Sequence, residues 1–126
     1  NIPYREDYLI EDRGADRLFK ELVLPEDMPT AFVCNNDEIA CILIEKLEKM
    51  GYRVPEDISV TGFDNYPFIR RNASGLTTVD VDIAMMASEG VELLLERLNE
   101  KRETFVRRVV SGHIVIREST GKVAEP

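Results

Sequence analysis

The sequence predicts an α/β fold, a doubly wound parallel sheet, from two observations. Short apolar runs rich in β-branched residues alternate along the chain with amphipathic segments of helical spacing, and strands joined by helices pair in parallel through right-handed crossovers. Two of the apolar runs also end directly in polar residues, as strands do at the ligand-binding edge of open α/β sheets. We therefore expect helices to cover both faces of the sheet.

The first half of the chain predicts a helix, a strand and a second helix. Apolar residues of segment 11–24 fall at helical spacing, and the two prolines of LPEDMP end this helix. Residues 30–34, TAFVC, form a short buried strand. The next helix begins at Asp37 and ends before a left-handed C-cap at Gly51. Its apolar stripe consists of Ile39, Ile42, Leu43, Leu47 and Met50.

The second half predicts two further strands, a long helix and a β-type tail. Residues 58–63, ISVTGF, form a central strand, and residues 76–81, LTTVDV, form another. Segment 82–98 is the clearest helix, and its apolar stripe must pack on something. The stripe consists of Ile83, Met86, Ala87, Val91, Leu94, Leu95 and Leu98, opposite Glu89, Glu92 and Glu96. In the tail, Ser111 and Gly112 separate two β-type runs.

Composition limits the classes of protein that the chain can belong to. Its 126 residues, 44% apolar and 32% charged, suffice for one modest core. A net charge of -8 without a long run of like charges argues against binding of this stretch itself to a phosphate backbone or an anionic membrane. No apolar stretch approaches the roughly 18 residues that span a bilayer, and the N-terminal residues lack the pattern of a signal peptide. We therefore expect no membrane contact and a cytoplasmic location.

The two cysteines and the single histidine leave little room for catalysis. Cys34 and Cys41 form neither a CxxC pair nor a secreted framework, so we interpret them as reduced, packed thiols. His113 is interpreted as a packed or surface residue rather than a ligand, because one histidine supports neither a metal cluster nor a nucleophile–histidine pair. Gly62 and Gly75 are isolated and form no phosphate loop. The sequence predicts no catalytic residue, no metal and no cofactor.

Polar residues follow two predicted strands and suggest a ligand site. Asn35, Asn36 and Asp37 follow the first strand, while Asp64 and Asn65 follow the second. Because the carboxyl ends of parallel strands meet at one edge, both groups should share one rim. An ionised Asp accepts hydrogen bonds from neighbouring hydroxyls and an Asn both donates and accepts, so the pair suits a polyol or sugar.

Two structural alternatives remain open for these residues. Asn35 or Asn36 can be the N-cap of the following helix, with Asp37 and Glu38 complementing its positive end. Asp64 can be a turn residue, because Asx side chains bond their own backbone at strand ends.

Four segments together resemble the C-terminal portion of LacI/GalR-family transcriptional regulators. They are, in order and in spacing, PTAFVCNNDEIA, GYRVPEDISVTGFDN, LTTVDVD and VIREST, which extend over about residues 25–120. The string VPEDISVTGFD is the most specific of the four. The resemblance implies part of a periplasmic-binding-protein-like effector domain with two lobes. A separate N-terminal helix-turn-helix segment, absent from this chain, would bind operator DNA.

The resemblance also implies a division of the chain. Residues 1–79 would form the second half of the C-terminal lobe, residues 80–111 would cross to the N-terminal lobe, and residues 112–126 would be the return strand and C-terminal tail. The helix of the crossing segment would then dock on a lobe that the chain does not contain. Its apolar stripe would otherwise form an exposed patch, which predicts self-association or rearranged packing.

The functional residues implied by the resemblance are few. Asn36 and Asp64 match the family positions that contact the small-molecule effector, commonly a sugar, and Tyr8 is the candidate for a ring-stacking aromatic. Val81 stands where a glutamine contact is frequent, so the effector can differ. The implied homodimer interface comprises Ile39, Leu43, Ile44, Leu47, Phe68 and Ile69.

The implied function is allosteric control of DNA binding by a small effector, without catalysis. One alternative is a solute-binding protein of a sugar transporter, which would share the fold but be exported. The other is a doubly wound enzyme with Asp64 as phosphoacceptor, which needs an acid cluster and a lysine at neighbouring strand ends. We find no lysine at any of those ends.

Overall fold

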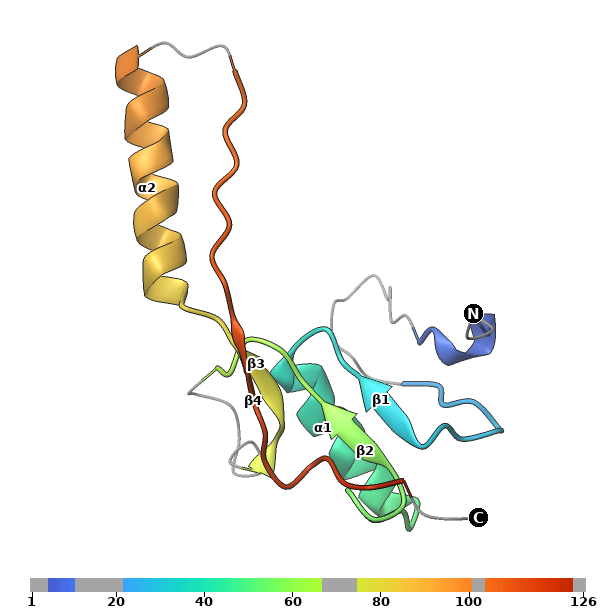
Figure 1. The fold of residues 1–126 in the computed structure, drawn as a ribbon. Coiled ribbons are helices and arrows are strands. Elements are labelled where there is room, and N and C mark those ends of the chain that lie inside the picture. Colours follow the sequence, from blue (N-terminus) through green and yellow to red (C-terminus); the bar gives the residue numbers. More distant parts are fainter. Residues whose placement is uncertain (1–4, 11–21, 67–74, 101–103, 124–126) are drawn as a thin grey trace.

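The structure, a computed structural model, describes residues 5–10, 22–66, 75–100 and 104–123 (Figure 1). Its elements are, in order, η1 (Glu6–Tyr8), β1 (Ala31–Val33), α1 (Asp37–Lys49), β2 (Ser59–Thr61), β3 (Thr78–Asp80), α2 (Ile83–Glu100) and β4 (His113–Val115). The predicted alternation of strands and helices from residue 30 onwards is confirmed. Of the first predicted helix, residues 11–21 lie outside the described residues, and residues 22–24 are not helical.

The sheet is parallel through three strands and antiparallel at its fourth. β1 pairs with β2 in parallel, with Phe32 opposite Val60. Parallel bridges from Thr61 to Thr77 and from Asp64 to Asp80 continue this order to β3. β4 runs antiparallel to β3, which departs from the all-parallel prediction. β4 is antiparallel because the chain leaves the sheet at the end of β3 and, after α2, re-enters it as β4 beside that same end (Figure 1).

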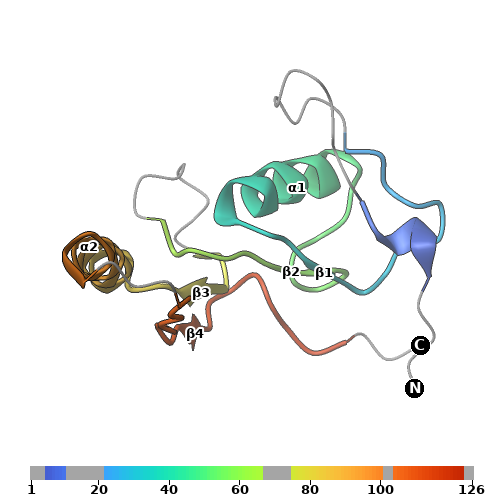
Figure 2. The same ribbon diagram turned by 90° about the horizontal axis from the view of Figure 1, so that it is seen from above.

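The core lies between α1 and the sheet, and α1 covers one sheet face (Figure 2). The helix begins at the N-cap Asn36 and ends before Gly51, whose φ of 93° is the left-handed C-cap that the sequence predicts. Cys34 and Cys41 form no disulfide and are buried in this core, as predicted. Burial raises the pKa of the Cys34 thiol to about 12, so this thiol stays protonated and unreactive at neutral pH. The core residues are Leu22, Phe32, Cys34, Ala40, Cys41, Leu43, Ile44, Leu47, Ile58, Val60 and Leu76.

The C-terminal segment joins β2 to the residues that precede β3 through Ser119, which is 5% exposed. The Ser119 hydroxyl donates to the Val60 carbonyl oxygen at 2.6 Å and accepts from the Thr77 amide at 2.8 Å. The Ser119 carbonyl accepts from the Val60 amide, and its amide donates to the Gly75 carbonyl. One residue therefore bonds both Val60 of β2 and Thr77, next to the bridge between Thr61 and Thr77.

α2 extends away from the sheet and exposes its apolar stripe (Figure 1). Val91, Leu94 and Leu98 are 56, 57 and 68% exposed among the described residues. The chain departs at Asp80 and returns at His113, and these two residues lie opposite each other in the β3–β4 pair. None of the described helices combines the length and apolar character needed to cross a bilayer.

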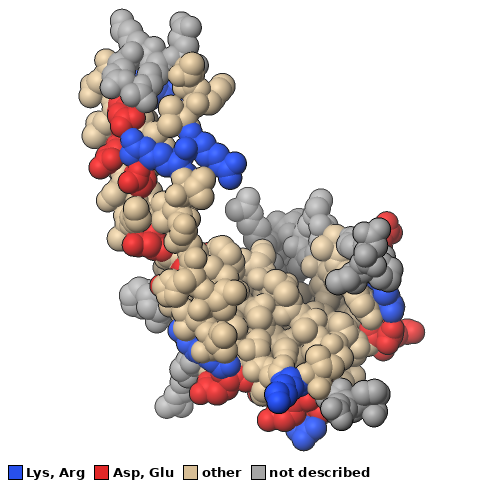
Figure 3. Space-filling view, in the orientation of Figure 1, with Lys and Arg blue, Asp and Glu red and all other residues tan. Residues whose placement is uncertain are grey.

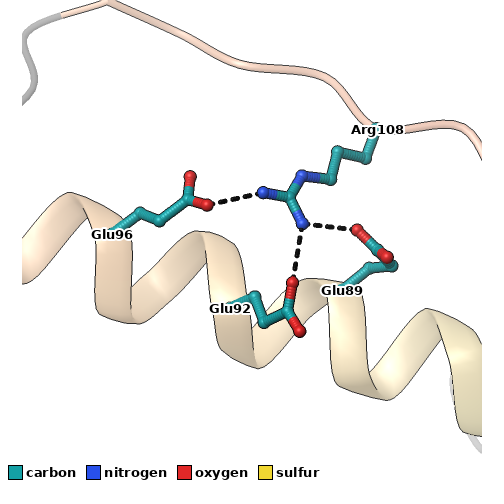
Figure 4. A network of polar contacts seen from close by, with 4 residues as sticks. All are labelled: Glu89, Glu92, Glu96 and Arg108. Atoms are coloured by element: carbon teal, nitrogen blue, oxygen red, sulfur yellow. Dashed lines mark hydrogen bonds and ion pairs between the residues drawn. The ribbon is translucent and has the colours of Figure 1, made fainter.

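The segment that returns from α2 is fastened to it by Arg108. One guanidinium nitrogen of Arg108 contacts Glu89 at 2.5 Å and Glu92 at 3.0 Å, and the other contacts Glu96 at 2.6 Å (Figure 4). In the space-filling view, red acidic atoms lie beside blue basic ones on this projecting part (Figure 3). These hydrogen bonds and charges raise the pKa of Arg108 above its ordinary value.

Arg108→Gln should therefore release residues 104–110 from α2 and leave the core unchanged. We expect faster amide hydrogen exchange confined to this segment, because the glutamine cannot neutralise three neighbouring carboxylates. High salt should reproduce part of the effect in the unmodified chain, since the ion pairs are partly exposed. Arg108→Lys keeps the charge and loses the planar fork, so it should give an intermediate rate. Unchanged exchange in Arg108→Gln would show that the cluster does not hold the segment.

Candidate functional site

The polar residues that follow β1 and β2 meet at one edge of the sheet. The Asp37 amide donates to the Phe63 carbonyl oxygen at 3.0 Å, and the Tyr66 amide donates to the Asp37 carboxylate at 2.9 Å. The predicted common rim is therefore present. Across the described ranges, no group of three or more His, Cys, Asp and Glu side chains is placed to hold a metal ion.

A backbone hydrogen bond fixes the position of Asp64, and its carboxylate is available to bind a ligand. Its φ is 97°, a value that residues with a side chain adopt at a cost of about 1–3 kcal/mol, and such strain gathers at ligand sites. The Asp64 amide donates to the Val79 carbonyl oxygen at 3.0 Å, which fixes the residue beside β3. The side chain is half-buried, and among the described residues no group hydrogen-bonds to its carboxylate. A half-buried acceptor on a fixed backbone, without a donor among the described residues, suits a ligand hydroxyl.

Asn65, the next residue, is occupied by the protein itself. Its side-chain nitrogen donates to Asp80 at 2.8 Å, and its side-chain oxygen accepts from Arg117 at 2.7 Å. Arg117 also donates to the Leu76 carbonyl oxygen at 2.7 Å. His113 lies on the surface, 3.7 Å from the other carboxylate oxygen of Asp80, so the surface interpretation of this histidine is the one that the structure shows. These contacts fix the Asn65 side chain to β3 and to the segment that follows β4.

Asp37 is the buried centre of the edge, whereas the sequence predicts it as a residue of the rim or as a charge at the helix start, and not as a buried one. It is 3% exposed. One carboxylate oxygen accepts from the Thr78 hydroxyl at 2.5 Å, and the other accepts from the Tyr66 amide. A side chain at Gly62 would collide with this carboxylate. The available signal was a glycine at the end of a strand that is otherwise β-branched, since such a glycine marks the close approach of another group.

Asn36 serves as the N-cap of α1. Its side-chain oxygen accepts from the Ile39 amide at 2.9 Å, in the extended conformation usual for this position. Of the two roles that the sequence allows for Asn36, the structure therefore shows the N-cap. No hydrogen bond of the Asn36 side-chain nitrogen is found among the described residues, so this donor remains available to a ligand.

Tyr8 is not brought to the edge. It belongs to η1, which lies on the β1 side of the molecule in both ribbon views, whereas β3 and β4 lie on the opposite side (Figures 1 and 2). Its ring lies 4.2 Å from the Arg5 guanidinium, and its hydroxyl donates to Asp27 at 3.5 Å. The ring of Tyr8, predicted to stack on the ligand, thus contacts a charged neighbour of its own segment and its hydroxyl contacts Asp27.

The predicted dimer surface needs correction. The resemblance places it at Ile39, Leu43, Ile44, Leu47, Phe68 and Ile69. Leu43, Ile44 and Leu47 are only 3, 6 and 0% exposed, because they form the face of α1 that packs on the chain's own sheet. Their side chains cannot also face a partner. Ile39 is half-buried, and Phe68 and Ile69 lie outside the described residues.

Comparison with known proteins shows that the chain is similar to transcriptional regulators of the LacI type. The family described as periplasmic binding protein-like domain matches residues 2–120. The HTH-type transcriptional repressor PurR of Mannheimia succiniciproducens is 36% identical and covers 98% of this chain. The arabinose metabolism transcriptional repressor of Geobacillus stearothermophilus is 28% identical over 97% of it. The chain spans only 38% and 36% of these two relatives.

Solved structures give the same result. A LacI transcriptional regulator from a Rhodococcus species is 34% identical, with a TM-score of 0.68 over 80% of this chain and 37% of that one. A regulator CelR in complex with cellobiose is 29% identical, with a TM-score of 0.65 over 71% of this chain and 28% of that one. A LacI family regulator from Enterococcus faecium with bound ribose is 28% identical, with a TM-score of 0.62 over 75% of this chain and 35% of that one.

Proposed function

The chain belongs to the family of periplasmic-binding-protein-like domains, in the branch of LacI/GalR-type transcriptional regulators, and we propose that it senses a small effector, a sugar, for such a regulator. The observation that carries this proposal is the Asp64 side chain, half-buried at the carboxyl edge of the sheet on a backbone with φ of 97°. The edge offers acceptors and one amide donor, which is the chemistry that hydroxyl groups need.

The sugar class is supported by the similar proteins. Two solved relatives hold ribose and cellobiose, and a curated relative carries arabinose metabolism in its name. We propose that Asp64 accepts from two neighbouring sugar hydroxyls and that the side-chain nitrogen of Asn36 donates to a third. Asn36 would then cap α1 with its oxygen and contact the ligand with its nitrogen. Tyr8 has no part in this proposal, because η1 is turned away from the edge.

We propose that residues 80–111 form an excursion to a second lobe of the regulator, between a first part at residues 1–79 and a return at 112–126. The exposed apolar stripe of α2 supports this division, since single helices with such a stripe are stabilised by packing rather than by propensity. The opposed positions of Asp80 and His113 also support it, because both crossings then pass through one narrow place. A sugar bound at the edge would shift the relative position of the lobes.

The proposed readout is DNA binding by a separate helix-turn-helix segment of a homodimeric, cytoplasmic regulator. The sugar changes operator affinity only by the difference in its own affinity for the two arrangements. In this proposal the dimer surface lies on the outer side of α1, where Ile39 remains partly accessible, and excludes the buried Leu43, Ile44 and Leu47. Sensing requires no turnover of the ligand.

A thermal-shift screen of the intact regulator tests the ligand site. The panel contains ribose, arabinose, hexoses, cellobiose and nucleobases, each with the unmodified protein and with Asp64→Asn. A sugar at about one hundred times its Kd should stabilise the unmodified protein by about 2.7 kcal/mol, and this gain should disappear in Asp64→Asn. Asp64→Asn without ligand should unfold near the temperature of the unmodified protein, because no described group depends on its carboxylate.

Glu56→Gln is the matched control for this screen. It removes the same charge in the turn that precedes β2, at the opposite end of the strand from Asp64. Its ligand response should equal that of the unmodified protein. A stabilising sugar whose effect survives Asp64→Asn would return Asp64 to a purely structural role.

A further inference from the structure

Asp37 holds both ends of the loop that carries Asp64 and Asn65. Its backbone amide donates to the carbonyl oxygen of Phe63, the residue before the pair. Its carboxylate accepts from the amide of Tyr66, the residue after the pair. Between these two anchors, Asp64 and Asn65 have φ values of 97° and 49°. A single residue on α1 therefore closes a loop whose backbone is in an unfavourable region.

The carboxylate is itself held from the sheet side. Its second oxygen accepts from the Thr78 hydroxyl at 2.5 Å, and the same hydroxyl oxygen accepts from the Asn65 amide at 3.4 Å. Thr78 is 1% exposed and Asp37 is 3% exposed, so water does not compete for these hydrogen bonds. The missing side chain of Gly62 makes the room for the carboxylate. The contacts link the first turn of α1, the 63–66 loop and β3.

Strained backbone persists only where its surroundings over-determine it. The 63–66 loop is joined to the β3 side by the Asp64 amide and by the hydrogen bonds of Asn65, and it is joined to α1 by two hydrogen bonds of Asp37. Loss of the Asp37 carboxylate would leave the Tyr66 amide without its partner and allow Asp64 to relax toward a negative φ. The direction of the Asp64 side chain would then change, although Asp37 itself has no access to a ligand.

From this geometry we propose that Asp37 is a positioning residue that aims the Asp64 carboxylate at the effector. The proposal rests on the function proposed above, and it deepens that function by assigning part of the ligand affinity to a buried residue outside the site. Asp37 also ties the loop to α1, so ligand contact at Asp64 and the position of the first turn of α1 are mechanically linked.

The test measures two quantities in the intact regulator with Asp37→Ala. The first is amide hydrogen exchange at Asn65 and Tyr66 without ligand, compared with amides of β1. The second is the affinity for ribose, arabinose and cellobiose, measured by calorimetric titration well below the unfolding temperature. We expect exchange at the two loop amides to rise and the affinity to fall, each by at least about tenfold, the change that one unmade hydrogen bond typically produces.

Leu47→Ala is the control for general destabilisation. Leu47 is fully buried on the same helix, and its truncation weakens the core without touching the loop. It should leave the loop exchange relative to β1 and the sugar affinity unchanged. Asp37→Asn keeps one acceptor for the Tyr66 amide and should recover part of the affinity. If Asp37→Ala does not fold, the same two measurements are made on Thr78→Val, which removes only the hydroxyl that bonds the Asp37 carboxylate. Thr78→Ser keeps a hydroxyl and should bind the sugar normally.

The outcomes separate the two proposals. Affinity that is lost in Asp64→Asn but retained in Asp37→Ala and in Thr78→Val overturns the positioning role alone. Loop exchange unchanged from that of Leu47→Ala overturns it as well, whether or not any sugar binds. Affinity retained in Asp64→Asn overturns the proposed ligand site, and loop exchange then decides on its own whether Asp37 fixes the loop.

Discussion

Gly62→Ala is expected to destabilise the chain by about 3 kcal/mol, at the upper end of the usual cost of overpacking. A methyl group at this position would lie 3.0 Å from a Leu76 side-chain carbon and 3.1 Å from the Asp37 Cα, and would overlap the Asp37 carboxylate. The carboxylate cannot turn aside without leaving the Thr78 hydroxyl and the Tyr66 amide unpaired. Urea unfolding followed by circular dichroism measures this change in free energy.

Gly90→Ala provides the control for the glycine substitution. Gly90 lies inside α2, and nothing approaches within 4 Å of the position that its side chain would occupy. Alanine there should stabilise the chain by about 0.5–1 kcal/mol, because it reduces the entropy lost when a helix forms. A Gly62→Ala variant as stable as the unmodified chain would mean that the edge is more loosely packed than the structure shows.

Ser119→Ala is expected to lower the free energy of unfolding by about 2–6 kcal/mol, because it leaves two buried backbone groups without partners at about 1–3 kcal/mol each. The Val60 carbonyl oxygen loses its donor, and the Thr77 amide loses its acceptor. Both groups lie where the C-terminal segment completes the sheet. The same urea unfolding experiment measures the loss.

Ser59→Ala is the matched control for Ser119→Ala. Within the described part of the chain, the Ser59 hydroxyl accepts from the exposed Gly121 amide alone, at 3.1 Å. Its removal should change the stability by no more than about 0.5 kcal/mol. Equal effects of the two serine substitutions would argue against a special role for the Ser119 hydroxyl.

Local patterns account for what could be predicted. The stripe and C-cap of α1 depend on residues within a few positions of each other, and so does the period of α2. The sequence therefore predicts both helices, the Gly51 cap and the order of the strands. The β1 and β2 ends share a rim because parallel strands end at the same edge, which needs only the class of the fold.

Contacts between distant residues account for most of what could not be predicted. Asp37 bonds Thr78 across 41 positions, and Ser119 bonds Val60 across 59. No pattern within a helix or strand specifies such pairs, so the sequence predicts Asp37 at the rim or at the helix start without its buried contacts, and it predicts no role for Ser119. The antiparallel direction of β4 has the same origin, since it depends on where the chain re-enters the sheet after α2.

The dimer residues show a different limit of sequence patterns. An apolar stripe on a helix is the same signal whether the helix packs on its own sheet or on a partner. For Leu43, Ile44 and Leu47 the sheet of the same chain is the partner, and burial leaves nothing for a second copy. The stripe of α2 is the opposite case, since its residues are exposed among the described residues.

The most direct test of the account is the affinity of the intact regulator for its operator, selected from random DNA, with and without the stabilising sugar. The account predicts that the sugar changes operator affinity by about 5–150-fold in the unmodified protein and in Glu56→Gln. In Asp64→Asn the operator affinity without sugar should be normal, and the response to sugar should be absent. A full sugar response in Asp64→Asn, or no response to any sugar in the unmodified protein, would contradict it.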